Sequence, residues 1–322
     1  MASTMAASPL NRDQFVSVVV DLHDDGHLLD AFTPELIDVL SRAYAEFEVV
    51  FVDDDSRDDT HERIARLLRR YERIRYLRLS RPFGREISVY AGMQCAIGDY
   101  VVTLSIRTDP PAIIPAMVER TMQLGGVVFG TCERRLDESI GYRYARIVYV
   151  WIARHLGIPL SRDASRFMVF SRQTSNALLE IKDRYRHVRI FTAYVGYGQG
   201  SFAYTQVPRG GRVARQSLLQ GVATGLHIVF ANSSSPLRAV AWLAVFTAAT
   251  SLVLAAGGWL TSERVPVELG VMFLAVAIVQ AVFAEYLAAL SEGTRNRPLY
   301  YVREEMSSSV LVTDRGRKNL TE

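Results

Sequence analysis

The sequence predicts an α/β domain with a mostly parallel sheet, followed by a C-terminal two-helix transmembrane hairpin. Strand-like runs alternate with helix-like segments between Phe15 and Leu104, and two long uncharged runs lie in the last third of the chain. The 322 residues are 49% hydrophobic and yet 22% charged, which indicates two consecutive regions of different composition, one of them strongly apolar. We therefore expect a flexible N-terminus (1–14), the α/β domain (15–215), a juxtamembrane segment (216–238), the hairpin (239–290) and a cytoplasmic tail (291–322).

The overall charge and the cysteine content exclude several classes of protein. Lys+Arg 37 against Asp+Glu 34 gives a net charge of +3, which disfavours a polybasic nucleic-acid binder. The apolar fraction is too large for a disordered chain. Cys95 and Cys132 are the only cysteines, so the sequence has neither a disulfide scaffold nor a cysteine-rich zinc module.

The first strand of the predicted domain is the β-branched run Phe15–Val20, which is typical of a strand buried on both faces. Thr33 then predicts the N-cap of a helix, with Pro34 at its first position. Strands alternating with helices imply parallel pairing. The patterns predict further strands at 48–52, 74–79, 101–104 and 126–130, and helices at 59–71 and 85–96.

Acidic residues follow the first two predicted strands, namely Asp24 and Asp25 and then Asp53 and Asp54. Ligands of parallel sheets bind at the carboxyl ends of the strands, so these residues are candidates for a ligand site. Asp after a strand can equally cap the next helix, and the run alone does not separate the two interpretations. A Rossmann or P-loop enzyme is disfavoured, because neither glycine-rich motif follows the first strand.

The two uncharged runs predict membrane spans. Ala239–Leu260 would extend roughly 33 Å as a helix, enough to cross a bilayer core. Leu269–Ala284 is the second run and continues past Glu285 to Leu290, and Pro266 breaks the short link between the runs. The alternative is a pair of buried helices in a soluble domain.

Arginines outside the two runs predict that both termini face the cytoplasm and that the protein spans the inner (plasma) membrane twice. The link between the runs carries only Arg264. The juxtamembrane segment is either an amphipathic helix on the membrane surface or a helix packed on the α/β domain. The flanking arginines are Arg209, Arg212, Arg215 and Arg238 before the first run and Arg295, Arg297 and Arg303 after the second.

Several short motifs follow one another along the chain. They are VSVVVDLHDD, VDDDS, SRPFGREISVYAG (80–92), TDPP (108–111), RIFTAYVGYGQ (189–199), the two runs and RPLYYVREE (297–305). In this order they resemble family 2 glycosyltransferases, and specifically the polyprenyl-phosphate subgroup that includes dolichol-phosphate mannose synthase and the bactoprenol glucosyltransferases. The resemblance covers nearly the whole chain.

This resemblance implies a GT-A-like, nucleotide-binding fold. It implies transfer of a hexose with inversion from a UDP- or GDP-linked sugar to undecaprenyl phosphate, as in the synthesis of cell-envelope polysaccharides. Membrane lipids are the other implied partner. The sequence leaves the oligomeric state open, and a second copy of the chain is a candidate partner that would bury Glu285 of the predicted hairpin. Asp24, Asp25, Asp53 and Asp54 match the positions that hold the base and ribose of the nucleotide, which suits hydrogen-bond acceptors.

Basic residues match the family at the positions expected to bind the acceptor phosphate. Arginine suits this role because its guanidinium can bind phosphate through two parallel hydrogen bonds. The alternative is that these side chains meet lipid headgroups or solvent. The candidates are Arg134, Arg135, Arg209, Arg212 and Arg215.

The chain departs from the family at its metal signature. The family implies Mg²⁺ or Mn²⁺ bound by an Asp-x-Asp motif, but here Ser105, Ile106 and Arg107 precede Thr108 and Asp109. No carboxylate lies between Asp99 and Asp109, so we assign no metal ligand. Bactoprenol glucosyltransferases tend to carry Gly-Asp-Phe where this chain has Ser165-Arg166-Phe167.

Two hypotheses follow for the catalytic set Arg107, Asp109 and Arg166. In the first, the guanidinium groups of Arg107 and Arg166 replace the metal in neutralising the leaving diphosphate, because arginine keeps its charge. In the second, the domain is a pseudo-glycosyltransferase that binds a nucleotide, a lipid or a membrane partner. A membrane-anchored interaction protein without a ligand is a third interpretation, which the intact Asp53-Asp54 segment disfavours.

Overall fold

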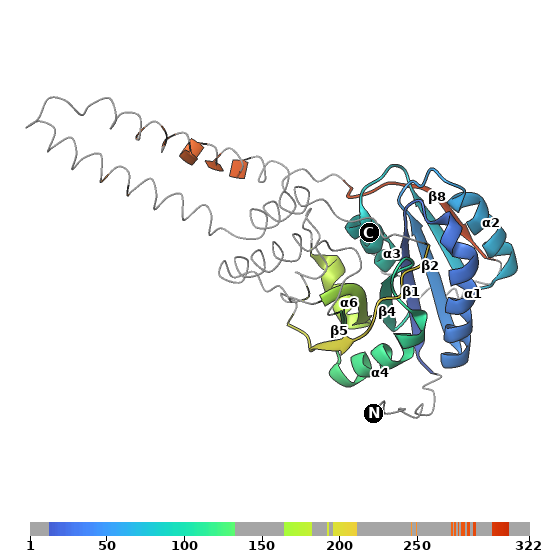
Figure 1. Ribbon diagram of the computed structural model, residues 1–322. Coiled ribbons are helices and arrows are strands. Elements are labelled where there is room, and N and C mark those ends of the chain that lie inside the picture. Colours follow the sequence, from blue (N-terminus) through green and yellow to red (C-terminus); the bar gives the residue numbers. More distant parts are fainter. Residues whose placement is uncertain are drawn as a thin grey trace, which may run out of the picture. The chain divides into compact units, whose positions relative to one another are not determined.

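The computed structural model describes residues 13–132, 164–181, 196–210 and 298–308, with isolated positions at 192, 246, 249 and between 272 and 287. The chain divides into two compact units. One contains Met1–Ile140, Leu160–Gln216 and Pro298–Glu322, and the other contains Gly141–Pro159 and Ser217–Arg297. The helices and strands named below belong to the first unit (Figure 1).

The described residues form one eight-stranded sheet. Its strands are β1 (Phe15–Leu22), β2 (Glu46–Asp53), β3 (Ile74–Leu79), β4 (Tyr100–Ser105), β5 (Val127–Thr131), β6 (Ala164–Ser171), β7 (Gln199–Ala203) and β8 (Val302–Ser307). Their order is β7-β5-β6-β4-β1-β2-β3-β8. β1 pairs in parallel with β2 and β4, β2 with β3, and β5 with β7. The pairs β4–β6, β5–β6 and β3–β8 are antiparallel. The predicted α/β class with a mostly parallel sheet is confirmed.

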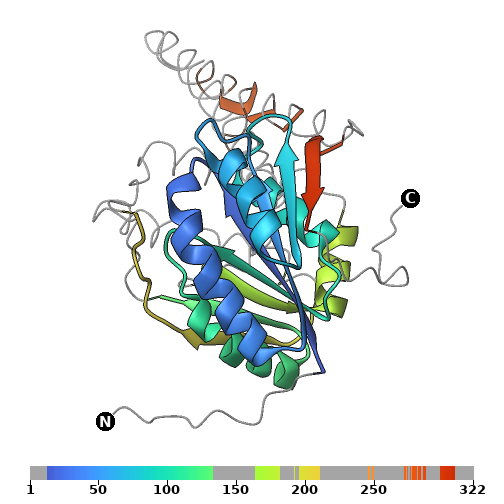
Figure 2. The same ribbon diagram turned by 90° about the vertical axis from the view of Figure 1, so that its right-hand side faces the viewer.

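Helices cover both faces of this sheet (Figure 2). They are α1 (Gly26–Ala43), α2 (Thr60–Arg70), α3 (Arg85–Cys95), α4 (Ile114–Leu124) and α6 (Arg172–Glu180), with a short 3-10 turn at Pro111–Ile113. All eight residues of β1 are buried, which agrees with its β-branched sequence. Val16, Val18 and Val20 of β1 face one core and Val19 faces the other, because side chains alternate along a strand.

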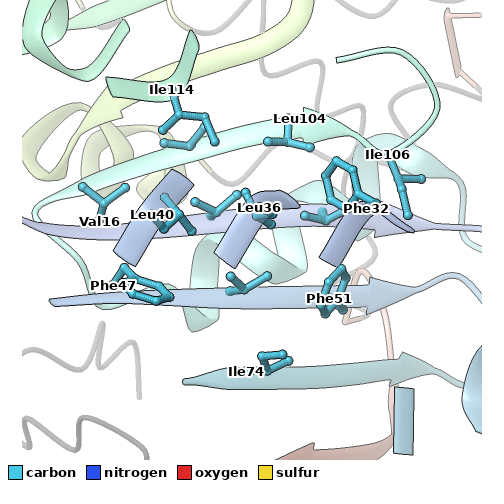
Figure 3. Packing of buried hydrophobic residues seen from close by; sticks show 14 of the residues in the cluster. Val16, Phe32, Leu36, Leu40, Phe47, Phe51, Ile74, Leu104, Ile106 and Ile114 are labelled. Carbon is cyan, nitrogen blue, oxygen red and sulfur yellow. The ribbon is translucent and has the colours of Figure 1, made fainter. Parts of the chain in front are cut away.

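The larger core lies between the sheet and the helices α1, α2 and α4 (Figure 3). Phe32, Leu36 and Leu40 recur with the helical period along α1 and are fully buried. On the other face, α3 lies so close to the sheet that a Cβ at Gly92 would be 2.3 Å from Val19 Cγ1. Close packing on both faces fixes where the ends of β1 and β4 lie.

The prediction that a helix begins at Thr33 is wrong. Helix α1 begins at Gly26 and contains Pro34 within it. The Gly26 N–H donates to Asp58 Oδ2 at 2.9 Å, across 32 positions of sequence, so a tertiary contact satisfies the start of the helix. The missing N–H of Pro34 is tolerated because the rest of the apolar face of α1 is buried in the core.

Strand β8 comes from the segment for which the sequence predicts only a tail. Val302–Ser307 pairs with β3, and the Ile74 N–H donates to Ser308 Oγ at 3.1 Å. Residues 298–308 are thus part of the α/β unit. No helix among the described residues is long and apolar enough to cross a membrane. Most of the predicted spans 239–260 and 269–290 lies outside the described residues.

Candidate active site

The candidate site lies where the sheet reverses its strand order. Strand β1 is followed by β2 on one side and borders β4 on the other, so the loops after β1 and β4 diverge at this point. In open parallel sheets, ligands bind in the crevice at such a switch point. Asp25 follows β1 and Arg107 follows β4, and the structure brings these two predicted residues together.

Asp25 and Arg107 form an ion pair across the switch point. Arg107 Nε lies 2.6 Å from Asp25 Oδ1, and Arg107 Nη2 donates to the carbonyl oxygen of His23 at 3.0 Å. The Asp25 side chain is 1% exposed, whereas that of Arg107 is 31% exposed. Arg107 is therefore held from inside the protein by its Nε and Nη2 while 31% of its side chain stays exposed.

The pKa of Asp25 is raised, mainly because the carboxyl group is buried. The hydrogen bond from the His23 N–H and the charge of Arg107 act in the other direction and lower this pKa. The His23 N–H donates to Asp25 Oδ2 at 3.0 Å. Arg107 thus helps to keep a buried carboxylate ionised, and the carboxylate in turn orients the guanidinium.

Asp109 has a structural role in the turn that presents Arg107. Its Oδ2 accepts from the Ser105 N–H at 2.8 Å, and its Oδ1 accepts from Tyr204 Oη at 2.7 Å and Thr108 Oγ1 at 3.2 Å. Burial raises the pKa of Asp109. Its carboxyl group closes the turn that follows β4 and carries Arg107, and its place in the catalytic set stays a prediction.

Arg85 is a charged residue of this region that the sequence analysis missed. It is the first residue of α3 and forms an ion pair with Asp21 of β1. The charge of Asp21, followed by those of Asp25 and Asp109, raises the pKa of Arg85. The sequence offered a signal, a basic residue directly after Gly84, but its partner is 64 positions away and only the fold identifies it.

The residues at this edge do not fit a divalent metal. Within the described part of the chain, no group of three or more His, Cys, Asp or Glu side chains could hold a metal ion. Asp25 and Asp21 face Arg107 and Arg85, and Asp109 is bonded within its own turn.

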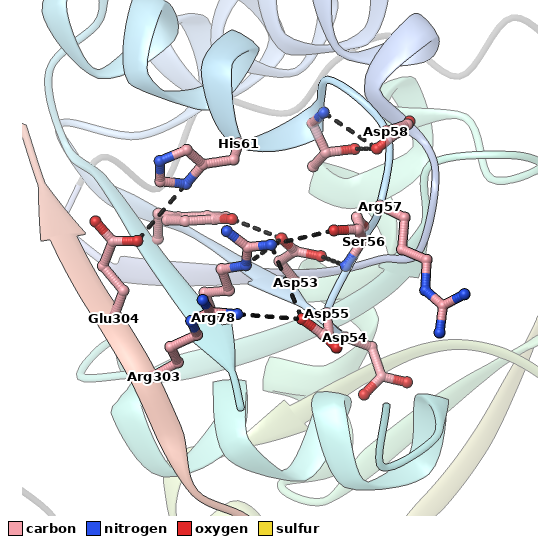
Figure 4. A network of polar contacts seen from close by, with 12 residues as sticks. Asp53, Asp54, Asp55, Ser56, Arg57, Asp58, His61, Arg78, Arg303 and Glu304 are labelled. Carbon is pink, nitrogen blue, oxygen red and sulfur yellow. Dashed lines mark hydrogen bonds and ion pairs between the residues drawn. The ribbon is translucent and has the colours of Figure 1, made fainter. Parts of the chain in front are cut away.

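Two of the predicted nucleotide-binding carboxylates shape the neighbouring loop (Figure 4). Asp53 is fully buried, and it accepts from the Ser56 N–H at 2.8 Å and from Tyr76 Oη at 2.6 Å. Asp54 accepts from the N–H groups of Phe83 and Gly84 at 2.7 and 2.8 Å. Together they tie the loop after β2 to β3 and to the start of α3.

Asp24 is the exposed member of the predicted nucleotide-binding set. Its backbone has a φ of 53°, in the left-handed region that Asp tolerates better than most residues. The Arg57 N–H donates to its Oδ1 at 2.8 Å. Of the four carboxylates, Asp24 is thus the one that solvent or a ligand can reach.

The other predicted arginines have different settings. Arg166 Nε lies 3.8 Å from Glu86 Oε1 of α3, so the ion-pair partner of Arg166 differs from that of Arg107. Arg209 lies against the turn after β4, where it bonds to Glu35 and to backbone carbonyls. The other four acceptor-phosphate candidates, Arg134, Arg135, Arg212 and Arg215, lie outside the described residues.

Comparison with known proteins matches part of this chain to a family. Residues 17–163 match the family described as Glycosyl transferase family 2. An undecaprenyl-phosphate 4-deoxy-4-formamido-L-arabinose transferase of Pectobacterium atrosepticum is 22% identical, over 92% of this chain and 95% of its own length. A bactoprenol glucosyl transferase of Shigella phage SfV is 24% identical, over 90% of this chain and 98% of its own.

Among solved structures, glucosyl-3-phosphoglycerate synthase from Mycobacterium tuberculosis, in complex with Mn²⁺, uridine diphosphate and phosphoglyceric acid, gives a TM-score of 0.48. It has 17% sequence identity and covers 68% of this chain and 77% of its own. The family match and the aligned relatives confirm the predicted resemblance. Residues 17–163 therefore carry a Glycosyl transferase family 2 domain, and the described strands form a mostly parallel α/β sheet.

Proposed function

We propose that this protein transfers a sugar from a UDP- or GDP-linked donor to undecaprenyl phosphate or a related polyprenyl phosphate. The observation that carries the proposal is the Asp25–Arg107 pair at the switch point of a family 2 domain. Relatives that align over nearly the whole chain support the lipid acceptor, because their names describe an undecaprenyl-phosphate sugar transferase and a bactoprenol glucosyl transferase.

The reaction needs little proton chemistry from the protein. A phosphate monoester is largely ionised near neutral pH, so an acceptor oxygen can attack the anomeric carbon without a strong base. The new bond joins that oxygen to the anomeric carbon, while the bond from this carbon to the diphosphate breaks. Its electron pair leaves with the nucleoside diphosphate. The protein must align the two groups and stabilise the negative charge that develops on the diphosphate.

Arg107 is placed to provide that stabilisation. It follows β4 at the carboxyl edge of the sheet, it is partly exposed, and it cannot lose its proton near neutral pH. Its Nε and one Nη are oriented by Asp25 and His23. A guanidinium held in this way is preorganised, so it stabilises developing charge without rearranging at the moment of reaction.

Asp24 is the carboxylate that we assign to the nucleoside. It is exposed at the end of β1, and carboxylate oxygens accept hydrogen bonds from ribose hydroxyls or a base N–H. Asp53 and Asp54 act indirectly, because their oxygens already bond to the loops that border the site.

A second candidate function is nucleotide binding without turnover. It is favoured by the partners of Asp21, Asp25 and Asp109, which all face arginines or bond within the fold. Such a domain would keep an anion site at Arg107 and lack the charge arrangement for transfer.

The full-length protein in detergent separates the two candidates. It is supplied with UDP- and GDP-linked hexoses and undecaprenyl phosphate, with and without EDTA, and lipid-linked sugar is measured. We expect transfer that persists in EDTA, because the described residues offer arginine rather than a metal site. Transfer abolished by EDTA would contradict the role of arginine. Nucleotide binding without transfer from any donor would favour the second candidate.

We also propose that residues 239–290 anchor the protein in the inner membrane by two spans, with both termini in the cytoplasm. The length and apolar character of the two runs support this, and so does the lipid acceptor. Deleting 239–290 should release the protein from membranes washed with alkaline carbonate, whereas the full-length protein stays. Residues 291–322 are kept in this variant, because β8 belongs to the sheet. Release of the full-length protein by the same wash would argue against the hairpin.

A further inference from the structure

Residues 204–210 lie along the turn that carries Arg107. The Val207 N–H donates to the Thr108 carbonyl oxygen and the Arg209 N–H donates to the Arg107 carbonyl oxygen, both at 2.9 Å. Tyr204 bonds to Asp109 in the same turn, and its ring packs edge-on against Phe167 with centroids 5.5 Å apart. Residues 204–210 thus hold the turn after β4 in place by backbone and side-chain hydrogen bonds.

The side chain of Arg209 connects this turn to α1. Its Nη2 donates to both Glu35 oxygens at 3.0 Å, and its Nη1 donates to the Asp109 carbonyl oxygen at 2.8 Å. Its guanidinium carbon lies 5.1 Å from the centroid of the Phe32 ring, and the side chain is 14% exposed. Bonds from Nη2 to a carboxylate and from Nη1 to a backbone carbonyl restrain the guanidinium on two sides.

These contacts join the two sides of the Asp25–Arg107 pair. Asp25 directly precedes α1, and Glu35 and Phe32 belong to α1. Arg107 belongs to the turn that Arg209 holds by its backbone and by the Asp109 carbonyl. Arg209 therefore sets the position of the turn after β4 relative to the loop after β1.

We infer that Arg209 is a positioning residue for Arg107 and that it acts on the binding of a nucleoside diphosphate through Arg107. This inference rests on the proposed function and deepens it. It differs from the role in acceptor binding that the family resemblance implies for Arg209. To bind a lipid phosphate, its guanidinium would first have to give up the bonds to Glu35 and to the Asp109 carbonyl.

A double-mutant cycle tests the inference on the full-length protein in detergent. The affinities of UDP and GDP are measured by calorimetry against those of UMP and GMP, for wild type, Arg107→Ala, Arg209→Ala and the double variant. The readout is the preference for diphosphate over monophosphate. We expect Arg107→Ala to lower this preference by about tenfold or more, as for loss of a charged hydrogen bond.

Arg209→Ala should lower the same preference by a smaller factor than Arg107→Ala does. In the Arg107→Ala background it should lower the preference by less than about twofold, because the effects of substitutions at residues that act through one another are not additive. Glu35→Gln, which conserves the shape of the side chain, should reproduce part of the loss if Arg209→Ala folds poorly. Arg209→Lys should recover part of it. The exposed Arg66 of α2 gives a matched control, since Arg66→Ala should leave the preference unchanged.

Independent losses from Arg107→Ala and Arg209→Ala, whose product equals the loss in the double variant, would overturn the inference and leave the proposed function standing. An unchanged diphosphate preference in Arg209→Ala, with a higher KM for undecaprenyl phosphate, would also overturn it. That result would assign Arg209 to binding of the acceptor phosphate. A wild-type protein without any diphosphate preference would overturn the proposed function itself, and the inference with it.

Discussion

Replacing Arg107 with alanine should lower the rate of sugar transfer by at least about a hundredfold, the effect typical of removing one preorganised donor to a developing negative charge. The residue is a partly exposed cation at the switch point of the sheet, and it is oriented by Asp25 and His23. Initial rates at saturating donor and acceptor measure the effect on kcat. The loss should be the same with and without EDTA.

Arg107→Lys is the informative companion variant. It keeps a positive charge near Asp25 but loses the planar group that contacts both Asp25 and His23, so transfer should fall between wild type and Arg107→Ala. Arg107→Ala also leaves Asp25 buried without its counter-charge, which raises the pKa of Asp25 further. The melting temperature of each variant separates a loss of charge stabilisation from a loss of fold. Unchanged transfer by well-folded Arg107→Ala would rule out the assigned role.

Replacing Asp53 with asparagine should lower the free energy of unfolding by about 2–4 kcal/mol. Asp53 is fully buried and accepts from two donors, the Ser56 N–H and Tyr76 Oη. An asparagine has one acceptor oxygen, so its NH₂ group must face one of these donors. The melting temperature of the full-length protein should fall by roughly 5–10 °C.

Asp55 offers a matched control two positions further along the same loop. Its ion pairs are 3.8 Å to Arg78 and 3.9 Å to Arg303, and 23% of its side chain is exposed. Asp53 has a similar 3.8 Å pair with Arg78, but it is fully buried and accepts two short hydrogen bonds as well. Its φ of 55° is one that asparagine adopts readily. Asp55→Asn should therefore change the free energy of unfolding by less than about 1 kcal/mol. Equal effects of the two substitutions would show that the bonds of Asp53 do not hold this loop.

The sequence alone predicted strands β1 to β5 well because their signal is local, whereas β6 and β7 were not predicted. The β-branched run of β1 is buried on both faces, and the predicted strand at 74–79 has the bounds that the structure shows for β3. The start of α1 was missed because a carboxylate 32 positions away satisfies the Gly26 N–H. Strand β8 was missed because an edge strand is defined by its partner, and its partner β3 lies more than two hundred residues earlier.

The candidate site divides in the same way. The residue types and their order determined the family and the place of Asp24, Asp25 and Arg107 at the ends of their strands. Only the tertiary structure decided which of these charges face one another. It pairs Asp25 with Arg107, Asp21 with Arg85 and Glu35 with Arg209. The physical reason is that the charge of a side chain follows from its residue type. Its partner, in contrast, depends on which loops the packed sheet and helices bring together.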